Sequence, residues 1–469
     1  MPSRSPMTYQ DHLSDADALM LTLEQDPTLR STIVSTWLLD RAPDLARFEH
    51  KLERALEIIP RLRQRIVRDA LGIATPKWER DPDFDLRFHL RRTHLGGDGT
   101  LRDLLDHAEP IAMQAFDMSR PLWELHLIDG LEGGRCAALM KLHHAISDGV
   151  GLVKMTECLI EKGPDDEELP PLRKTDADFA PPSAWERLGD ALEHRISSAL
   201  ENLESAGSAA ANEAFDAVRN PVARFRELRD TASSIARVLA PASEPMSPVM
   251  RDRSTRVRFD YLSVPLEELK RAGKTQGASV NDAFVAAVAG GLARYHEEQG
   301  SPVDCLRMLM PVNVRSGERA SEVGNQFSPA RFEVPVGISD PAKRIRAIRA
   351  ASREQRDEPA LPLIGPISAA LGRLPESAVV ALFGAMQRTT DFTTSNVPGP
   401  RRPTWMSGAR VEAVLPFGPL AGAALNVTVF SYDGAMHVGI NADPAAVDDP
   451  ELLFECLQKS FDEVLTIVA

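Results

Sequence analysis

The chain has 469 residues, more than a single hydrophobic core usually serves, so we expect two domains. Hydrophobic residues make up 43% of it and charged residues 26%, as in soluble globular proteins. The formal net charge of −14 argues against nucleic acid as a partner, because backbone phosphates require a cationic surface. An anionic membrane would also repel the chain, so any membrane contact needs a local basic or apolar patch.

Cysteine usage and the N-terminus indicate a reduced, cytoplasmic protein. The cysteines lie apart in apolar surroundings, without the spacing of a zinc site or a disulfide framework: Cys136, Cys158, Cys305 and Cys456. The first residues include acids and no apolar region of signal length, and no run of about 18 uncharged apolar residues occurs. We therefore expect no metal, no secretory signal and no transmembrane helix.

The N-terminal part is expected to alternate helices and strands. The expected elements are a short helix from residue 13, a strand over 31–39, a helix over 45–66, a strand within 78–90 that includes His89, and a helix over 101–115. A half-buried strand over residues 123–128 then turns at 130–134 into the next strand. Trp123 is interpreted as a core anchor that places this next strand.

That next strand, residues 136–142, is a short apolar run that ends at two adjacent histidines, His143 and His144. Asp148-Gly149 follows with turn chemistry and opens a helix. Strand ends that lead into helices are where open α/β sheets expose reactive groups. A lone histidine beside a strand is most often a hydrogen-bonded structural residue, whereas this whole string favours catalysis.

A linker separates the two halves. Residues 164–182 are acidic and rich in proline, the composition of an exposed linker. Two amphipathic helices follow, and the second, over residues 215–239, carries several arginines: Arg219, Arg224, Arg226, Arg229 and Arg237. This second helix either contacts a lipid surface or packs between the domains.

The C-terminal half again alternates strands and helices. The expected elements are strands over 256–264, 306–314 and 331–335, helices over 265–274, 283–295 and 338–353, a hairpin that turns at Asp433-Gly434, and a final helix over 451–467. Ser279 fits the N-cap of the helix over 283–295, with Asn281 and Asp282 in its first turn, where the helix dipole favours acids. Residues 393–400 are interpreted as a loop by composition.

The string from His143 to Gly149 matches the HHxxxDG signature of the CoA-dependent acyltransferase superfamily, which includes chloramphenicol acetyltransferase and peptide-synthetase condensation domains. Alone, it indicates only the superfamily. Further stretches resemble the bacterial wax ester synthase/diacylglycerol acyltransferase family: Pro121-Leu122-Trp123, Asn281-Asp282 and Ser395-Asn396-Val397-Pro398-Gly399-Pro400. The resemblance runs from about residue 13 to the end and is weakest over 164–250.

The resemblance implies an α/β fold of two chloramphenicol-acetyltransferase-like domains, each a mixed sheet with helices. Residues 1–163 would form the N-terminal domain with the histidines, 164–250 a crossover linker, and 251–469 the C-terminal domain. The active site would lie in a tunnel at the interface, open to CoA on one side and to the alcohol on the other. Such two-sided access suits a ternary complex without a metal or redox cofactor, with acyl-CoA as a substrate.

Esterification of a thioester by an alcohol needs a base for the hydroxyl proton, and imidazole has a suitable pKa near neutrality. The superfamily resemblance gives this role to His144. The hydroxyl would attack the acyl-CoA carbonyl directly, because no Gly-x-Ser-x-Gly nucleophile elbow surrounds the histidines. His143 is interpreted as a support for the strand end that also lines the site.

The other site residues have roles that the resemblance suggests. Asp148 would form a buried ion pair with an arginine of the other half, for which Arg315 is the candidate. Ser395 or Asn396 could donate a hydrogen bond to the oxyanion. Gly149 would let backbone and substrate approach closely, and Trp123, Asn281 and Asp282 would be structural supports.

Three functional classes stay open. The first is an acyl-CoA-dependent acyltransferase that makes triacylglycerol from diacylglycerol, or wax esters from fatty alcohols, with contact to a peripheral membrane or lipid-droplet surface. The second is a carrier-protein-dependent condensation or polyketide acyltransferase, although no carrier domain is fused here. The third is a noncatalytic lipid-binding protein. The Pro-Leu-Trp, Asn-Asp and Ser-Asn-Val-Pro-Gly-Pro stretches favour the first.

Two local features bear on substrate binding. Residues 61–65 form a basic cluster that is either a solvated face or a contact for CoA phosphates. The chain also departs from the family after its Leu-Ser-x-x-Asp start, where residues 27–30 replace the usual Met-His segment. Because of this departure, the preferred acceptor stays open. The sequence also leaves the acyl chain length and the oligomeric state open.

Overall fold

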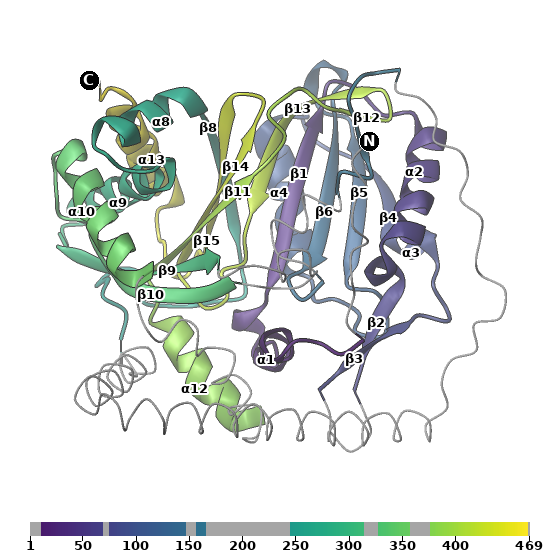
Figure 1. Cartoon of the computed structure of the whole chain (residues 1–469), viewed down its shortest axis with the longest axis horizontal. Coiled ribbons are helices and arrows are strands. Elements are labelled where there is room, and N and C mark those ends of the chain that lie inside the picture. Colours follow the sequence, from purple (N-terminus) through teal and green to yellow (C-terminus); the bar gives the residue numbers. More distant parts are fainter. Residues whose placement is uncertain are drawn as a thin grey trace, which may run out of the picture.

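The computed structural model describes residues 11–68, 75–146, 156–165, 244–313, 327–356 and 376–467. These residues form two lobes side by side, each with a central sheet (Figure 1). Within the described ranges, no helix is long and apolar enough to cross a membrane.

The first lobe is built on a seven-stranded sheet with the order β4-β5-β6-β1-β13-β12-β7. Its strands are β1 (Thr32–Leu39), β4 (Leu90–His94), β5 (Trp123–Asp129), β6 (Cys136–His143), β7 (Ile160–Glu161), β12 (Trp405–Met406) and β13 (Ala409–Phe417). A separate two-stranded antiparallel sheet consists of β2 (Gln64–Val67) and β3 (Lys77–Arg80). The histidine strand β6 is central, antiparallel to both β1 and β5.

The second lobe is built on a six-stranded sheet with the order β10-β9-β11-β14-β15-β8. Its strands are β8 (Arg258–Pro265), β9 (Cys305–Asn313), β10 (Phe327–Pro335), β11 (Phe392–Pro398), β14 (Leu425–Tyr432) and β15 (Ala435–Ala442). β11 runs parallel to β14 along its length but pairs with β9 only at Phe392 and Thr393. The later residues of β11 therefore leave the β9 side of the sheet.

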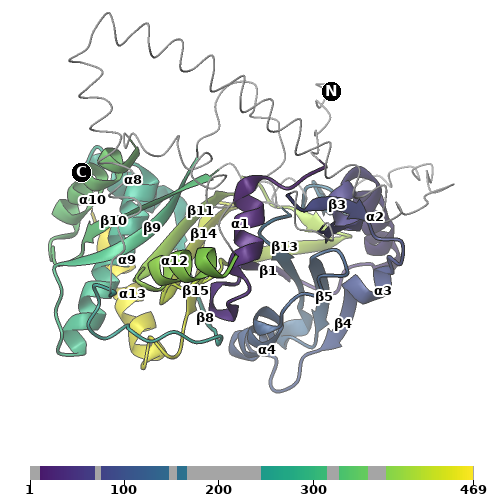
Figure 2. The same ribbon diagram turned by 90° about the horizontal axis from the view of Figure 1, so that it is seen from below.

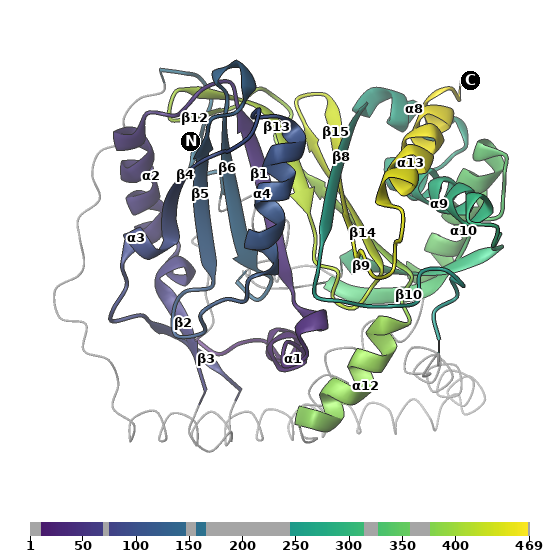
Figure 3. The same cartoon turned by 180° about the vertical axis from the view of Figure 1, so that it is seen from behind.

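Helices cover both sheets. In the first lobe they are α1 (Asp15–Leu23), α2 (Leu45–Ile58), α3 (Leu86–His89) and α4 (Leu101–Met113), with the short turns η1 (Pro27–Leu29), η2 (Pro60–Arg63) and η3 (Glu132–Gly134). In the second they are α8 (Leu266–Thr275), α9 (Val280–Glu298), α10 (Pro341–Arg356), α12 (Glu376–Arg388) and α13 (Pro450–Leu465). Figure 3 shows α4 against the rear of the first sheet, and Figure 2 shows α1 beside α12 between the lobes.

The buried helix α9 explains the small residues in its sequence. A Cβ atom on Gly291 would lie 2.7 Å from the Cα atom of Leu457 in α13. Glycine at this position therefore lets the two helices approach closely. Phe284 of α9 and Phe461 of α13 are also buried where these helices pack.

The two halves of the sequence do not form two separate sheets. Although they come late in the chain, β12 and β13 lie in the first sheet, and β13 pairs with β1 from Val34 to Leu39. β15 passes so close to β13 that a Cβ atom on Gly439 would overlap the carbonyl oxygen of Pro416. The boundary expected at residue 251 thus does not follow the sheets, because strand partners are set by packing and not by chain order.

Two aromatic pairs also join the lobes. Trp37 of β1 and Phe430 of β14 meet edge to face, with ring centroids 6.0 Å apart. On the α4 face, Phe259 of β8 and Phe417 of β13 are stacked at 4.0 Å. Such aromatic pairs add about 0.5–1.5 kcal/mol beyond their burial, so the lobes share a packed interface.

Most expected elements of regular pattern are confirmed, including the strand over 31–39 and the hairpin at Asp433-Gly434, where both residues have positive φ. The helix expected over 45–66 ends at Ile58, because Pro60 starts a 3₁₀ turn and residues 64–67 then form a strand. His89 ends a helical turn and is not in a strand, since the Asp85 carboxylate caps that turn.

The loop expected over residues 393–400 is wrong, because Phe392–Pro398 forms β11. Its polar composition suggested a turn. The strand instead forms because β14 provides backbone partners along its whole length, and the β-branched Thr393, Thr394 and Val397 suit a pleated surface.

Candidate active site

The structure places the expected site residues at two points. His143 ends β6 and His144 follows it, with Trp123 at the start of the neighbouring β5. Asn281 and Asp282 lie in the first turn of α9, and Ser395 and Asn396 lie in β11. The remaining three, Asp148, Gly149 and Arg315, lie outside the described residues.

The end of β6 is held on both sides, as a strand end in the middle of a sheet should be. The backbone N–H of His143 donates to the carbonyl of Leu122 at 3.0 Å, and that of His144 donates to the carbonyl of Ser31 at 2.9 Å. The N–H of Ile146 then donates back to the carbonyl of His143 at 3.0 Å, which closes a turn. The expectation that the histidines sit at a strand end is confirmed.

The imidazole of His143 is buried, and both of its nitrogens have partners. Nδ1 accepts the backbone N–H of Ala145 at 3.0 Å, and Nε2 lies 2.9 Å from Oε1 of Glu24. Because a backbone N–H can only donate, Nδ1 is unprotonated, and the ring proton is on Nε2 and is donated to the carboxylate. Neither nitrogen can take a substrate proton without breaking one of these bonds.

Glu24 is a site residue that the sequence pattern did not reveal. It caps the C-terminus of α1 and lies 119 residues before His143. Burial raises the pKa of its carboxyl group, but the hydrogen bonds from His143 and Ser31 and the charge of Arg30 more than offset this and hold the pKa below its ordinary value. Nothing in the local spacing could have linked a glutamate at a helix end to the histidines.

His144 differs from its neighbour in exposure. Its side chain is partly exposed, whereas His143 is fully buried. His144 is therefore less enclosed than His143, although its Nδ1 atom is buried. The two adjacent imidazoles have different surroundings although their sequence context is shared.

Trp123 is a core anchor, as its alternation suggested. Its indole N–H donates to the carbonyl of Leu62 at 2.8 Å, and its ring stacks on His89 at 4.5 Å. The backbone of Trp123 is directly opposite Leu142 in β6. The residue therefore fixes the strand that leads to the histidines.

A buried charge cluster lies under the same strand. Lys141, two residues before His143, is fully buried; its ammonium donates to the carbonyl of Gln114 at 2.7 Å and lies 3.7 Å from the Glu124 carboxylate. It also lies 4.5 Å from the centre of the Phe116 ring, which meets His143 edge-on. Burial lowers the pKa of Lys141, while the charge of Glu124 opposes this. The sequence shows one lysine in an otherwise apolar run and does not reveal its buried partners.

The structure brings two of the family-like stretches together. The Asn396 amide donates to Oδ1 of Asn281 at 3.2 Å, so that β11 meets the N-terminus of α9. Ser279 and Asp282 form a capping box: the Asp282 N–H donates to the Ser279 hydroxyl, and the Ser279 N–H donates to the Asp282 carboxylate at 2.8 Å. The expected N-cap at Ser279 is confirmed.

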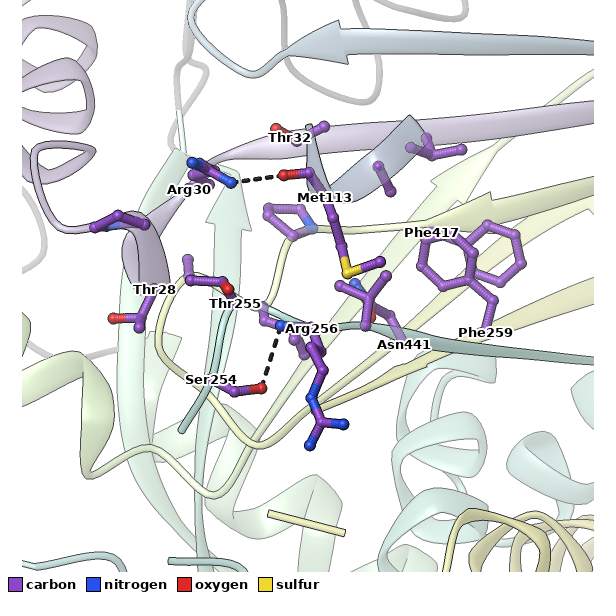
Figure 4. Close-up of a pocket in the computed structure, with 17 residues that line it drawn as sticks. Thr28, Arg30, Thr32, Met113, Ser254, Thr255, Arg256, Phe259, Phe417 and Asn441 are labelled. Carbon is purple, nitrogen blue, oxygen red and sulfur yellow. Dashed lines mark hydrogen bonds between the residues drawn. The ribbon is translucent and has the colours of Figure 1, made fainter. Parts of the chain in front are cut away.

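A small cavity lies where the lobes meet (Figure 4). Its volume is about 50 Å³, and its lining includes Thr32, which is paired with His143, and Met113 from the first lobe, with Arg256 and Asn441 from the second. Ligand pockets usually measure about 300–1,000 Å³, so this cavity alone cannot hold a long acyl chain. It shows that residues of both lobes converge beside the histidine strand.

The basic cluster at residues 61–65 is partly engaged within the protein. The Arg61 guanidinium is buried and lies over the Trp78 ring at 4.4 Å, and Arg63 pairs with Glu57 at 3.0 Å. This arrangement differs from a freely solvated face. Separately, among the residues that the structure describes, no three His, Cys, Asp or Glu side chains are grouped to hold a metal ion.

The fold is also found in other solved structures. The wax ester synthase/diacylglycerol acyltransferase from Marinobacter aquaeolei VT8 superposes with a TM-score of 0.63 at 21% identity, over 97% of this chain and 98% of that one. The first condensation domain of the calcium-dependent antibiotic synthetase superposes with a TM-score of 0.61 at 18% identity, over 98% and 96% of the two chains. The chain thus has the two-lobed condensation-like α/β fold.

Sequence similarity is more specific. The wax ester synthase/diacylglycerol acyltransferase catalytic domain matches residues 13–284, and the C-terminal domain of the same family matches residues 323–464. A putative diacylglycerol O-acyltransferase of Mycobacterium tuberculosis (strain ATCC 25618 / H37Rv) is 38% identical over 460 residues, 97% of this chain and 92% of that protein. The chain belongs to the wax ester synthase/diacylglycerol acyltransferase family and is an acyltransferase.

Proposed function

We propose that the chain transfers the acyl group of a long-chain acyl-CoA to the hydroxyl group of diacylglycerol, or to that of a long-chain fatty alcohol. Family membership and the names of the relatives support this choice over a carrier-dependent condensation enzyme. The observation that carries the mechanism is the contrast within the histidine pair: both ring nitrogens of His143 are used, while His144 is partly exposed.

His144 is the general base. It takes the proton of the acceptor hydroxyl, and the oxygen attacks the carbonyl carbon of the thioester to form a tetrahedral oxyanion. Collapse of this intermediate breaks the carbon–sulfur bond, and the imidazolium returns its proton to the CoA thiolate. The products are the ester and free CoA, and no acyl group is bound to the protein.

The oxyanion is stabilised by a donor on β11, Ser395 or Asn396. The Asn396 amide has two N–H groups, of which one is used by Asn281. The second is available for a developing negative charge. Preorganised donors of this kind contribute about 10²–10³-fold to the rate in other acyl transfers.

The acceptor is insoluble in water, so the enzyme draws it from a lipid surface as a cytoplasmic, peripherally associated protein. The expected contact is the arginine-bearing segment 215–239, which lies outside the described residues. Flotation with anionic liposomes tests this. If Arg224→Glu, Arg226→Glu and Arg229→Glu together leave binding unchanged, another surface makes the contact.

The functional test is release of free CoA thiol from palmitoyl-CoA, measured with diacylglycerol, with hexadecanol and without an acceptor. Acceptor-dependent release with ester formation supports the proposal. A condensation enzyme would be supported if neither diacylglycerol nor hexadecanol promoted release of CoA thiol, but a substrate bound to a carrier-protein thiol did. Binding without release would indicate a noncatalytic lipid-binding protein.

A further inference from the structure

A carboxylate from a distant segment contacts the histidine pair. Glu24, at the end of α1, has a side chain that is 17% exposed. Its Oε1 atom receives two hydrogen bonds, from Nε2 of His143 at 2.9 Å and from the backbone N–H of Ser31 at 2.5 Å. Hydrogen bonds to an ionised acceptor are roughly twice as strong as neutral ones.

Hydrogen bonds connect Glu24 to the backbone of His144 and to the residues on either side of it. Ser31, whose N–H is bound to Glu24, accepts the backbone N–H of His144 at 2.9 Å through its carbonyl. His143, which donates to Glu24, accepts the N–H of Ala145 at 3.0 Å. The residues on both sides of His144 and its own backbone are therefore connected to one carboxylate.

The segment that follows Glu24 is held from the other lobe. Gln25 donates to the Glu376 carboxylate of α12 at 2.5 Å, and Arg388 of α12 donates to Asp26 at 2.5 Å. Figure 2 shows α1 and α12 side by side between the lobes. The two residues that follow Glu24 thus tie the end of α1 to α12.

We propose that Glu24 is a positioning residue for acyl transfer: through His143 and Ser31 it holds the turn that carries His144 in its working position. The inference rests on the proposed role of His144 as the base. Glu24 touches no substrate; it acts by fixing His143 as the Nε2–H tautomer with its Nδ1 atom on Ala145. A displacement of about 1 Å in a catalytic group can lower a rate by about 10²-fold.

The test separates reach from charge. Glu24→Gln keeps the length of the side chain and an oxygen that accepts both hydrogen bonds, but it removes the charge. Glu24→Asp keeps the charge, but its carboxylate is withdrawn by one carbon–carbon bond, about 1.5 Å. For a positioning residue we expect Glu24→Gln to keep kcat within about tenfold of the wild type and Glu24→Asp to lose about 10²-fold, as misplacement of the base predicts.

A matched control and a second readout exclude a general loss of structure. Glu132→Gln makes the same chemical change at an exposed carboxylate that contacts Arg135 and not Glu24 or the histidines, so it should leave kcat unchanged. The KM for acyl-CoA should stay within about twofold in all three variants, because Glu24 does not touch the donor. Nitrogen-15 NMR of labelled histidine should show His143 as the Nε2–H tautomer in the wild type and Glu24→Gln, and a tautomer mixture in Glu24→Asp.

Three results would contradict the positioning role of Glu24. If Glu24→Asp is as active as Glu24→Gln, or if the His143 tautomer is the same in both, Glu24 does not position the turn. If Glu24→Gln is inactive although folded, the charge and not the reach matters, and the positioning role is overturned. His144→Ala separates this inference from the proposed function: an active His144→Ala would reject the base assignment, whereas an inactive one with normal Glu24 variants rejects only the inference about Glu24.

Discussion

The two points that hold the candidate site residues are built in different ways. At the N-terminus of α9, Ser279 and Asp282 are three positions apart in the sequence, and the side chain of each accepts a hydrogen bond from the backbone N–H of the other. At the end of β6, His143 depends on Glu24, which is 119 residues away. The first arrangement is local and can be read from the sequence, whereas the second exists only after α1, β1 and β6 have come together.

The difference shows where each point is vulnerable. A helix cap adds a limited amount of stability, and its loss frays one turn. The end of β6 positions an imidazole for chemistry, and small displacements there affect the rate much more than the stability. The predictions below test whether the distant contacts, and not the local ones, control activity.

The largest effect is expected at the histidines. His144→Ala should lower single-turnover acyl transfer from a long-chain acyl-CoA to diacylglycerol by about 10²–10⁴-fold, the usual contribution of a general base. Binding of acyl-CoA, measured alongside, should be retained, because the imidazole acts on the acceptor proton. His143→Ala should lose less, since it acts through geometry. A nearly normal His144→Ala with an inactive His143→Ala would move the base to the first histidine.

The second effect concerns Asp148 and Arg315, whose pairing remains an expectation outside the described residues. If they form a buried ion pair between the halves, either change to Ala should lower the free energy of unfolding by roughly 3–5 kcal/mol. Chemical denaturation of both single variants and of the double variant measures this. The double variant should lose much less than the sum; simple additivity would show that the two side chains do not meet.

A smaller effect is expected at the local site. Ser279→Ala removes the exposed cap of α9 and should lower the free energy of unfolding by about 0.5–2 kcal/mol. Because the neighbouring bond between Asn281 and Asn396 does not use this hydroxyl, kcat should remain close to that of the wild type. A large loss of kcat with little change in stability would mean that the cap, too, serves the chemistry.

The last effect depends on pH and comes from a distant contact between the lobes. Asp260 of β8 lies 3.1 Å from Arg102 of α4, and burial raises its pKa from 3.8 to about 6 despite the charges of Arg102 and Arg258. The folded state therefore binds this proton more tightly than the unfolded state, and the stabilisation present at low pH is lost as pH rises from about 4 to 6. The Tm of Asp260→Asn relative to the wild type should increase over this range, whereas a difference that is constant with pH would contradict the burial. Asp106→Asn, at an exposed carboxylate that also contacts Arg102, is the control.

The sequence revealed those features that depend on neighbours in the chain. The strand before the histidines, the alternation at Trp123 and the cap at Ser279 are all set by spacing within a few residues. It did not reveal Glu24 or the buried charge of Lys141, because their partners are distant in sequence. It also misassigned β11, since polar residues resemble a loop until a neighbouring strand pairs with them.

The first sheet includes β12 and β13, which come late in the chain. The two lobes therefore depend on each other during folding. Without β13, the eight residues of β1 would present an open edge with unpaired backbone N–H and C=O groups. Edges of this kind recruit other strands and promote aggregation. A nascent N-terminal half emerging from the ribosome therefore holds an unfinished sheet until residues 409–417 have been synthesised, and its unpaired edge is prone to aggregation for that interval.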